Sequence, residues 1–150
     1  MTRRSPLVIA LIVISLLVVL FASGVWRQYS MDDAARTLTL RVVEDTLSSG
    51  TAQTLIEYAH PDLLTAIPAE SLNAYVASIP RALGDLEALT TLSGGADIPL
   101  LPFGSTPSVA QFTVGLMFAE APGEARITLT RLNEQWRVTS YDIASPLLAN

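Results

Sequence analysis

Apolar residues fill almost every position near the start of the chain. The segment from Leu7 to Trp26 carries no charge, and three arginines flank it: Arg3, Arg4 and Arg27. Twenty residues at about 1.5 Å each make a helix of about 30 Å, which matches the hydrocarbon thickness of a bilayer. The pattern therefore predicts a membrane-spanning helix over residues 7–26, in contact with the lipid bilayer.

The charges around this segment predict its orientation. Positive charge is concentrated before the span, which places the N-terminus in the cytoplasm. Trp26 and Tyr29 suit the far interface, where aromatic rings favour the headgroup level. The expected protein has an anchor in residues 1–27 and an exported domain in residues 28–150. It crosses the inner (cytoplasmic) membrane once, with its C-terminal domain in the periplasm or an equivalent exterior space.

A cleaved secretory signal is the alternative for the same segment. Ala22-Ser23-Gly24 offers small residues at the spacing that a signal peptidase needs, and the basic start also fits. The apolar core, however, is at the upper length limit for such signals, so a retained anchor is favoured. Both alternatives place the following domain outside the cytoplasm.

Helical periodicity follows the apolar segment. Ser30 is a candidate N-cap for a helix that ends at Gly50, with Leu40, Val43 and Leu47 on its apolar face, widened by Leu38 and Val42. A second, short helix is expected over residues 52–59. It should stop before His60-Pro61, because a residue that precedes proline avoids helical geometry. A third helix is expected from Pro68 to Leu83, with a kink or an early stop at Pro80.

From residue 85 onward the pattern has a period of two. Residues 85–93 are expected to form a strand that alternates Leu86, Ala88 and Thr90 against Glu87, Leu89 and Thr91. Residues 94–107 are rich in glycine and proline and predict a loop. Three more strands follow, with turns at 121–123 and 133–135, and the first places its apolar residues on one face: Ala110, Phe112, Val114, Leu116 and Phe118. The expected fold is α+β, with about three helices on a four-stranded antiparallel sheet.

Composition and charge narrow the function classes. The chain of 150 residues has no cysteine, which excludes disulfides and thiolate metal sites. Beyond residue 27, six arginines stand against fourteen acidic residues, a net charge of −8. Such an acidic domain repels phosphate backbones, so nucleic acid is not an expected partner.

His60 is the only histidine, and it lies between Tyr58 and Asp62. A catalytic base must be held within hydrogen-bond reach of its partner, and residues two apart do not face each other on a helix. We therefore expect His60 to have a structural role at a helix terminus. The adjacent carboxylates Asp32-Asp33 and Glu44-Asp45 diverge by about 100° around a helix axis and do not predict an acid–base pair. No metal or cofactor site is expected from these residue spacings.

Two further sets of residues are candidates for binding. A pocket between sheet and helices would be lined by Phe112, Met117, Phe118, Trp136 and Tyr141, although such a set more often fills a small core. A partner surface would use apolar residues of the loop and polar residues of the outer sheet face: Leu100, Leu101, Phe103, Gln111, Thr113, Thr128, Thr130 and Thr139. In the last strand, Trp136, Val138 and Ser140 are expected to alternate against Arg137, Thr139 and Tyr141.

The order of helices, strand, loop and meander, closed by "LNEQWRVTSYDI", resembles a known arrangement. It is similar to the cystatin-like α+β families around nuclear transport factor two and ketosteroid isomerase, over about residues 31–144. The resemblance implies a curved sheet wrapped against the helices, and often dimerisation through the sheet. Several relatives carry one N-terminal span, including inner-membrane assembly subunits of type IV secretion systems. The base and oxyanion residues of the enzyme members have no match in this chain.

The leading hypothesis from the sequence is a non-catalytic, membrane-anchored interaction or assembly domain, for example an accessory subunit of an envelope complex or a homodimer. The alternative is a binder of a small apolar ligand in a cone-shaped pocket, with or without isomerase- or dehydratase-like chemistry. An open cone lined by the sheet would favour the ligand binder, and a filled cone would favour the interaction domain.

Overall fold

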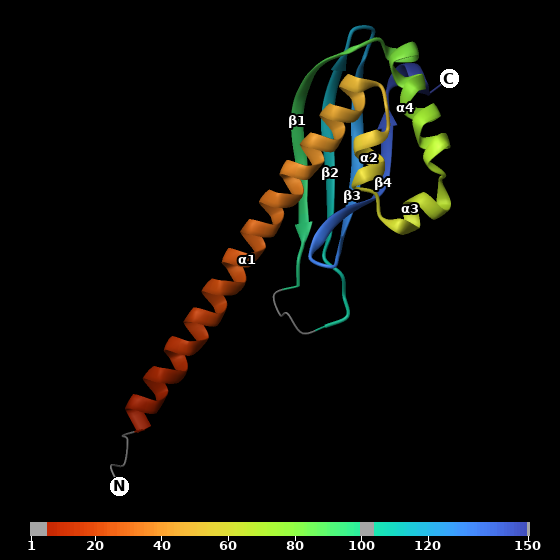
Figure 1. The fold of residues 1–150 in the computed structure, drawn as a ribbon. Coiled ribbons are helices and arrows are strands. Elements are labelled where there is room, and N and C mark those ends of the chain that lie inside the picture. Colours follow the sequence, from red (N-terminus) through yellow and green to blue (C-terminus); the bar gives the residue numbers. More distant parts are fainter. Residues whose placement is uncertain (1–5, 100–103, 150) are drawn as a thin grey trace.

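The computed structural model describes residues 6–99 and 104–149, and Figure 1 shows a long helix that leads into an α+β domain. The elements in chain order are α1 (Pro6–Ser49), α2 (Gln53–Glu57), α3 (Pro61–Ala66), α4 (Ala69–Leu83), β1 (Leu86–Asp97), β2 (Val109–Phe118), β3 (Pro122–Leu132), β4 (Gln135–Ala144) and the 3₁₀ helix η1 (Pro146–Leu148).

Helix α1 joins the apolar segment to the domain without a break. The sequence predicts a new helix capped by Ser30, and this prediction is wrong, because Ser30 lies inside α1. The residues between Trp26 and Met31 contain no proline or glycine, so nothing in the backbone interrupts the helix. The N-terminal half of α1 projects away from the domain, as Figure 1 shows.

The C-terminal half of α1 packs on the sheet. Its buried residues recur every three or four positions: Met31, Ala35, Thr39, Val42, Val43, Thr46 and Leu47. This spacing forms one helical face, as expected for a helix that covers a sheet. Val42, Val43 and Leu47 belong to the predicted apolar stripe, whereas Leu38 and Leu40 are only half-buried at its borders.

Three shorter helices follow, at positions that differ in part from the expected ones. The short helix expected over 52–59 is found as α2, but α3 was not expected. Helix α4 agrees with the predicted third helix, and it continues through Pro80 to Leu83 instead of stopping early. Gly84 then ends it with a φ of 77°, a conformation that glycine adopts without steric cost.

The sheet has the order β1-β2-β3-β4, with every neighbouring pair antiparallel. The apolar residues predicted to share one face of β2 are all buried. A two-residue turn joins β3 to β4, with Asn133 and Glu134 both at positive φ, as a tight hairpin turn requires. The turn before β3 lies at residues 119–121, slightly earlier than predicted, since Pro122 and Gly123 already belong to the strand.

Strand β1 is longer than predicted and does not follow a period of two. Its half-buried leucines are Leu86, Leu89 and Leu92, each separated by two exposed residues. Two irregularities in the pairing with β2 add residues to the strand and shift its phase. The strand then continues through Gly94 to Asp97, a stretch that the sequence predicts as loop.

A similar irregularity reverses the predicted alternation in β4. Thr128 pairs with Ser140 and Leu129 with Val138, so Thr139 is an additional residue in β4. Beyond this bulge, Tyr141 and Ile143 lie on the inner face with Val138, and Ser140 is exposed. The sequence assigns Tyr141 to the face opposite Trp136, and that assignment is wrong.

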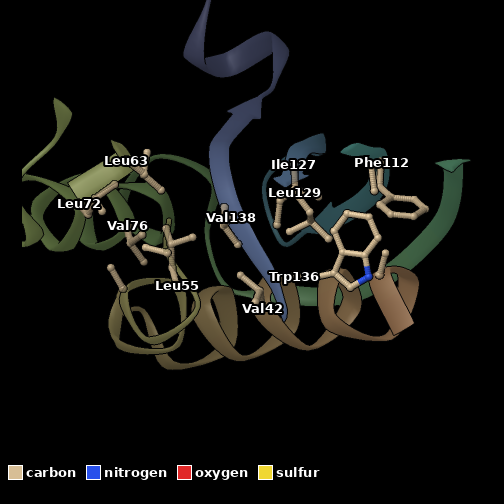
Figure 2. Packing of buried hydrophobic residues seen from close by; sticks show 14 of the residues in the cluster. Val42, Leu55, Leu63, Leu72, Val76, Phe112, Ile127, Leu129, Trp136 and Val138 are labelled. Carbon is tan, nitrogen blue, oxygen red and sulfur yellow. The ribbon is translucent and has the colours of Figure 1, made fainter. Parts of the chain in front are cut away.

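The core lies between the sheet and its helices. Figure 2 shows apolar side chains from α1, α2, α3, α4 and the sheet packed together, with the indole of Trp136 beside α1 and near Phe112. A second cluster at the other end of the sheet contains Leu47, Leu83 and Phe118. Tyr75 and Tyr141 contact both clusters, so they join the two parts of the core.

Candidate functional site

The predicted pocket residues do not line one cavity. Phe112 and Trp136 pack in the first core cluster, Phe118 packs in the second, and Tyr141 lies between the two. Met117 points to the other face of the sheet, where its side chain is 40% exposed. The inner members of this set therefore fill the space between sheet and helices in the described part of the chain.

The candidate site that the structure does assemble is a joint between α1 and the sheet, which we define as Met31, Asp32, Arg36, Gly94, Ala96 and Trp136. Asp32 and Arg36 are one turn apart and form an ion pair of 2.7 Å between Nε and Oδ2. The other oxygen of Asp32 accepts a hydrogen bond from the Ala96 N–H at 2.8 Å. Arg36 donates to the Gly94 carbonyl at 2.8 Å. One helical turn thus binds two backbone groups of β1.

Other contacts strengthen the joint from inside the core. The Arg36 guanidinium lies 5.4 Å from the centre of the Phe112 ring, within the range of a cation–π contact. The indole N–H of Trp136 donates to the Met31 carbonyl at 3.1 Å, and this hydrogen bond is buried. β1 and β4 are the two edge strands of the sheet, and both form hydrogen bonds with the same part of α1, residues 31–36.

Gly95 permits this close approach. A Cβ atom at this position would lie 3.3 Å from the Asp32 carboxylate, so a side chain would crowd the group that binds Ala96. Burial alone would raise the pKa of Asp32, but the hydrogen bonds from Arg36 and Ala96 outweigh it and lower the pKa below its usual value. Asp32 is therefore an ionised anchor point at neutral pH.

The edge of β4 that does not pair with β3 is covered by residues 58–60 and by Tyr75. The Tyr58 carbonyl and the His60 N–H bond to Val138 at 2.8 and 2.7 Å and add a short parallel bridge at Ala59. Further along, the Ile143 N–H donates to the Tyr75 hydroxyl at 2.9 Å. A partner strand could not occupy these positions of the edge without displacing these bonds.

His60 caps α3. Its Nδ1 accepts a hydrogen bond from the Asp62 N–H at 3.1 Å, and Pro61 occupies the first helical position. The predicted position of His60 at a helix terminus is confirmed, although the residue starts a helix and does not only follow one. Its Nδ1 is used by the cap, so the ring has one nitrogen left for other contacts.

Three buried hydroxyls lack a hydrogen-bond partner within the described residues: those of Thr39, Thr46 and Tyr141. Burial raises the pKa of Tyr141, and the neighbouring Tyr75 adds to the effect. A phenol of this kind does not release its proton near neutral pH. Within residues 6–99 and 104–149, no cluster of three or more histidine or acidic side chains could hold a metal ion.

Only part of the predicted partner surface lies within the described residues. Thr113, Thr128, Thr130 and Thr139 are half-buried on the outer sheet face, and Gln111 is exposed there. The Thr139 hydroxyl donates to the Thr128 carbonyl across the bulge in β4. Leu100, Leu101 and Phe103 lie outside the described residues.

The joint was not predicted from the sequence. The spacing of Asp32 and Arg36 is typical of an ion pair on a helix and could have indicated the local half of it. Their bonds to Gly94 and Ala96, however, span more than fifty residues of chain. No local pattern predicts such contacts.

Comparison with other proteins finds no match: no protein-family model, curated protein or solved structure is similar to this chain at a significant level.

Proposed function

We propose that this chain is a non-catalytic, membrane-anchored domain that acts by contact with another protein on the outer side of the inner membrane. The observation that carries the proposal is the unbroken α1, which leads from an apolar segment directly into the core of the domain. Among residues 6–99 and 104–149, one helix is long and apolar enough to cross a membrane, and its most apolar stretch is not buried against the domain. An exposed apolar surface of this size needs a lipid or protein environment.

The proposed contact surface is the outer face of the sheet. Both edge strands are occupied at several positions, by Asp32 and Arg36 on one side and by residues 58–60 and Tyr75 on the other. Helices α1, α2 and α4 cover the opposite face in Figure 1, and η1 borders the outer face, where Pro146 lines a hollow together with Met117 and Glu124. Its half-buried threonines and exposed Gln111 suit a polar interface with a second copy of the chain or with an envelope protein.

The alternative is a binder of a small apolar ligand in a cone between sheet and helices, with a cystatin-like arrangement. The filled space around Phe112 and Trp136 supports the interaction domain over this alternative. A ligand would have to displace the indole of Trp136 from α1, and the Met31 hydrogen bond would be lost with it.

The orientation can be tested with a fusion of alkaline phosphatase to the C-terminus, which we expect to be active because the positive charge precedes the span. An inactive fusion, together with an active cytoplasmic reporter at the same position, would contradict the proposed orientation. Mass analysis of the purified chain would detect the N-terminal residues, which a cleaved signal would lack.

The contact surface can be tested with Thr130→Arg in the full-length chain. An arginine at this half-buried position should reduce association through the outer face while the melting temperature remains close to wild type. Analytical ultracentrifugation in detergent measures the association, with Gln53→Arg on the exposed start of α2 as the matched control. A wild-type chain that is monomeric and captures no partner, or an equal effect of both variants, would contradict the sheet-face interface.

A further inference from the structure

A hollow of about 340 Å³ lies between α1 and the end of β1. The residues that line it are Val25, Gln28, Tyr29, Asp32, Gly95 and Ala96. Its volume is in the range of clefts that hold small molecules. The hollow is separate from the core clusters, which contain none of its α1 residues.

The position of the hollow along α1 determines which level of a bilayer it would meet. Val25 belongs to the segment expected to cross the bilayer, and Asp32 already contacts the sheet through Ala96. Seven residues of helix separate these two positions, a rise of about 10 Å. The headgroup region on each side of a bilayer is about 5–8 Å thick. The hollow therefore crosses the level at which acyl chains give way to headgroups.

The direction of the strands brings the domain to the same level. β1 runs back toward the N-terminal half of α1, and the turn between β3 and β4 lies at this end of the sheet as well (Figure 1). Because the joint fixes α1 to β1 at Gly94 and Ala96, the end of the sheet cannot move away from the membrane without breaking those bonds. Val25 and Gln28 are half-buried, although both precede the first buried residue of the domain, Met31.

The lining indicates which headgroup would fit. Gln28, Tyr29 and Asp32 supply oxygen acceptors, while Val25 and Ala96 supply apolar surface. Arg36 is engaged by Asp32 and the Gly94 carbonyl, so it offers little to an additional anion. The net charge of −8 beyond residue 27 further disfavours anionic lipids.

We propose that this hollow binds the headgroup of a zwitterionic phospholipid with an ammonium donor, such as phosphatidylethanolamine, so that the domain rests on the outer leaflet. The proposal depends on the membrane anchoring of the proposed function. Tyr29, which is 75% exposed, and Val25 would contact the lipid near the acyl boundary, and the acceptors of Gln28 and Asp32 would receive hydrogen bonds from the ammonium group.

The absence of cysteine makes a clean test of the geometry possible. Asp97→Cys and Glu87→Cys place an environment-sensitive fluorophore at opposite ends of β1, both at exposed positions about 30 Å apart. The full-length chain is inserted into phosphatidylethanolamine-rich nanodiscs that contain a lipid with a nitroxide quencher on its headgroup. We expect loss of fluorescence at position 97 and full fluorescence at position 87.

The hollow itself is tested by native mass spectrometry of the chain released from the same nanodiscs. Gln28→Trp should fill the hollow and abolish retention of a lipid that the wild-type chain keeps, and Thr37→Trp, exposed on the same helix, should retain it. Retention should also fall when phosphatidylglycerol replaces phosphatidylethanolamine.

The possible outcomes distinguish a failure of the proposed lipid site from a failure of the proposed membrane anchoring. Full fluorescence at position 97, in a chain that resists alkaline extraction from membranes, would overturn the resting domain and leave the anchor intact. Equal lipid retention by wild type and Gln28→Trp would overturn the site, and preferential retention of phosphatidylglycerol would overturn the headgroup class. Release of the chain by alkaline extraction would instead contradict the anchoring on which the proposal depends.

Discussion

The two halves of α1 share one helix but have surfaces suited to different solvents. Before Met31 the apolar side chains point in all directions and, apart from the half-buried Val25, the large ones are exposed, and from Met31 onward they form one buried face. The two tryptophans show the contrast well, because Trp26 is 80% exposed and Trp136, which packs on the second half, is 7% exposed. The helix continues across this change because backbone hydrogen bonding is the same in both environments, whereas side-chain burial decides which solvent each half needs.

The largest expected effect is a difference in domain stability between substitutions of the two tryptophans. Trp136→Ala removes a buried indole and leaves the Met31 carbonyl without its donor, so we expect a loss of about 3–5 kcal/mol of unfolding free energy. Small domains have about 5–15 kcal/mol in total, so the variant should be poorly folded. Trp26→Ala is the control and should leave thermal unfolding of the domain in detergent unchanged. Similar melting temperatures for both variants would show that the indole of Trp136 is not a core element.

The continuity of α1 can be broken with Ser30→Pro. Proline inside a helix costs about 3 kcal/mol, but at the first turn of a helix it is tolerated. The domain half should therefore restart at residue 30 and keep its melting temperature, while the junction with the N-terminal half of α1 becomes flexible. Spin labels at Leu20→Cys and Glu87→Cys measure this by double electron–electron resonance: a narrow distance distribution in the parent chain should become broad. A distribution that is equally broad in both chains would mean that α1 is not rigid at the junction.

The stability that the joint contributes should decrease at acid pH. Because the folded pKa of Asp32 is lowered, its contribution to stability is present above the unfolded value of about 3.9 and is lost as the pH falls through the folded value. Asp32→Asn should reduce stability by about 1–2 kcal/mol at neutral pH, after allowance for partial exposure. It should also flatten the acid limb of the pH–stability curve measured by urea unfolding. Asp33→Asn is the exposed control. An unchanged acid limb in Asp32→Asn would exclude Asp32 as its source.

The smallest effect concerns the cap of α3. His60→Ala removes the acceptor of the Asp62 N–H and should cost about 1 kcal/mol or less, with any cellular activity intact. His60→Asn keeps an acceptor at the same position and should be closer to wild type in thermal unfolding. Loss of activity in His60→Ala at an unchanged melting temperature would revive a catalytic role for this residue.

The sequence predicted best those elements in which local pattern and burial agree. The alternation of β2 placed Phe112 and Val114 inside, and Pro68 and Gly84 indicated the limits of α4. The α+β class followed from the order of helical and strand periods. In each of these cases the residues within a few positions of one another determine the structure.

The failures in β1 and β4 share a physical cause: contacts between distant residues changed the local geometry. One additional residue at Thr139 turned Tyr141 inward, and the hydrophobic pattern does not indicate where such a bulge occurs. Gly94 accepts a hydrogen bond from Arg36 and Ala96 donates one to Asp32, so a glycine-rich segment that favours a loop became the end of strand β1. The same contacts form the joint, and for this reason the fold class was easier to predict than the candidate site.

The joint also affects how strongly a partner could bind. A domain on a flexible linker loses rotational freedom when it docks, and this loss opposes association. Here α1 is bound at Asp32, Arg36 and Met31, so the outer sheet face already has a fixed position relative to the N-terminal half of α1. If the chain is anchored as we propose, a partner in the same membrane would meet that face with most of the orientational entropy already removed. Modest contacts between polar threonines would then suffice for association in the plane of the membrane, although the same contacts would be weak in solution.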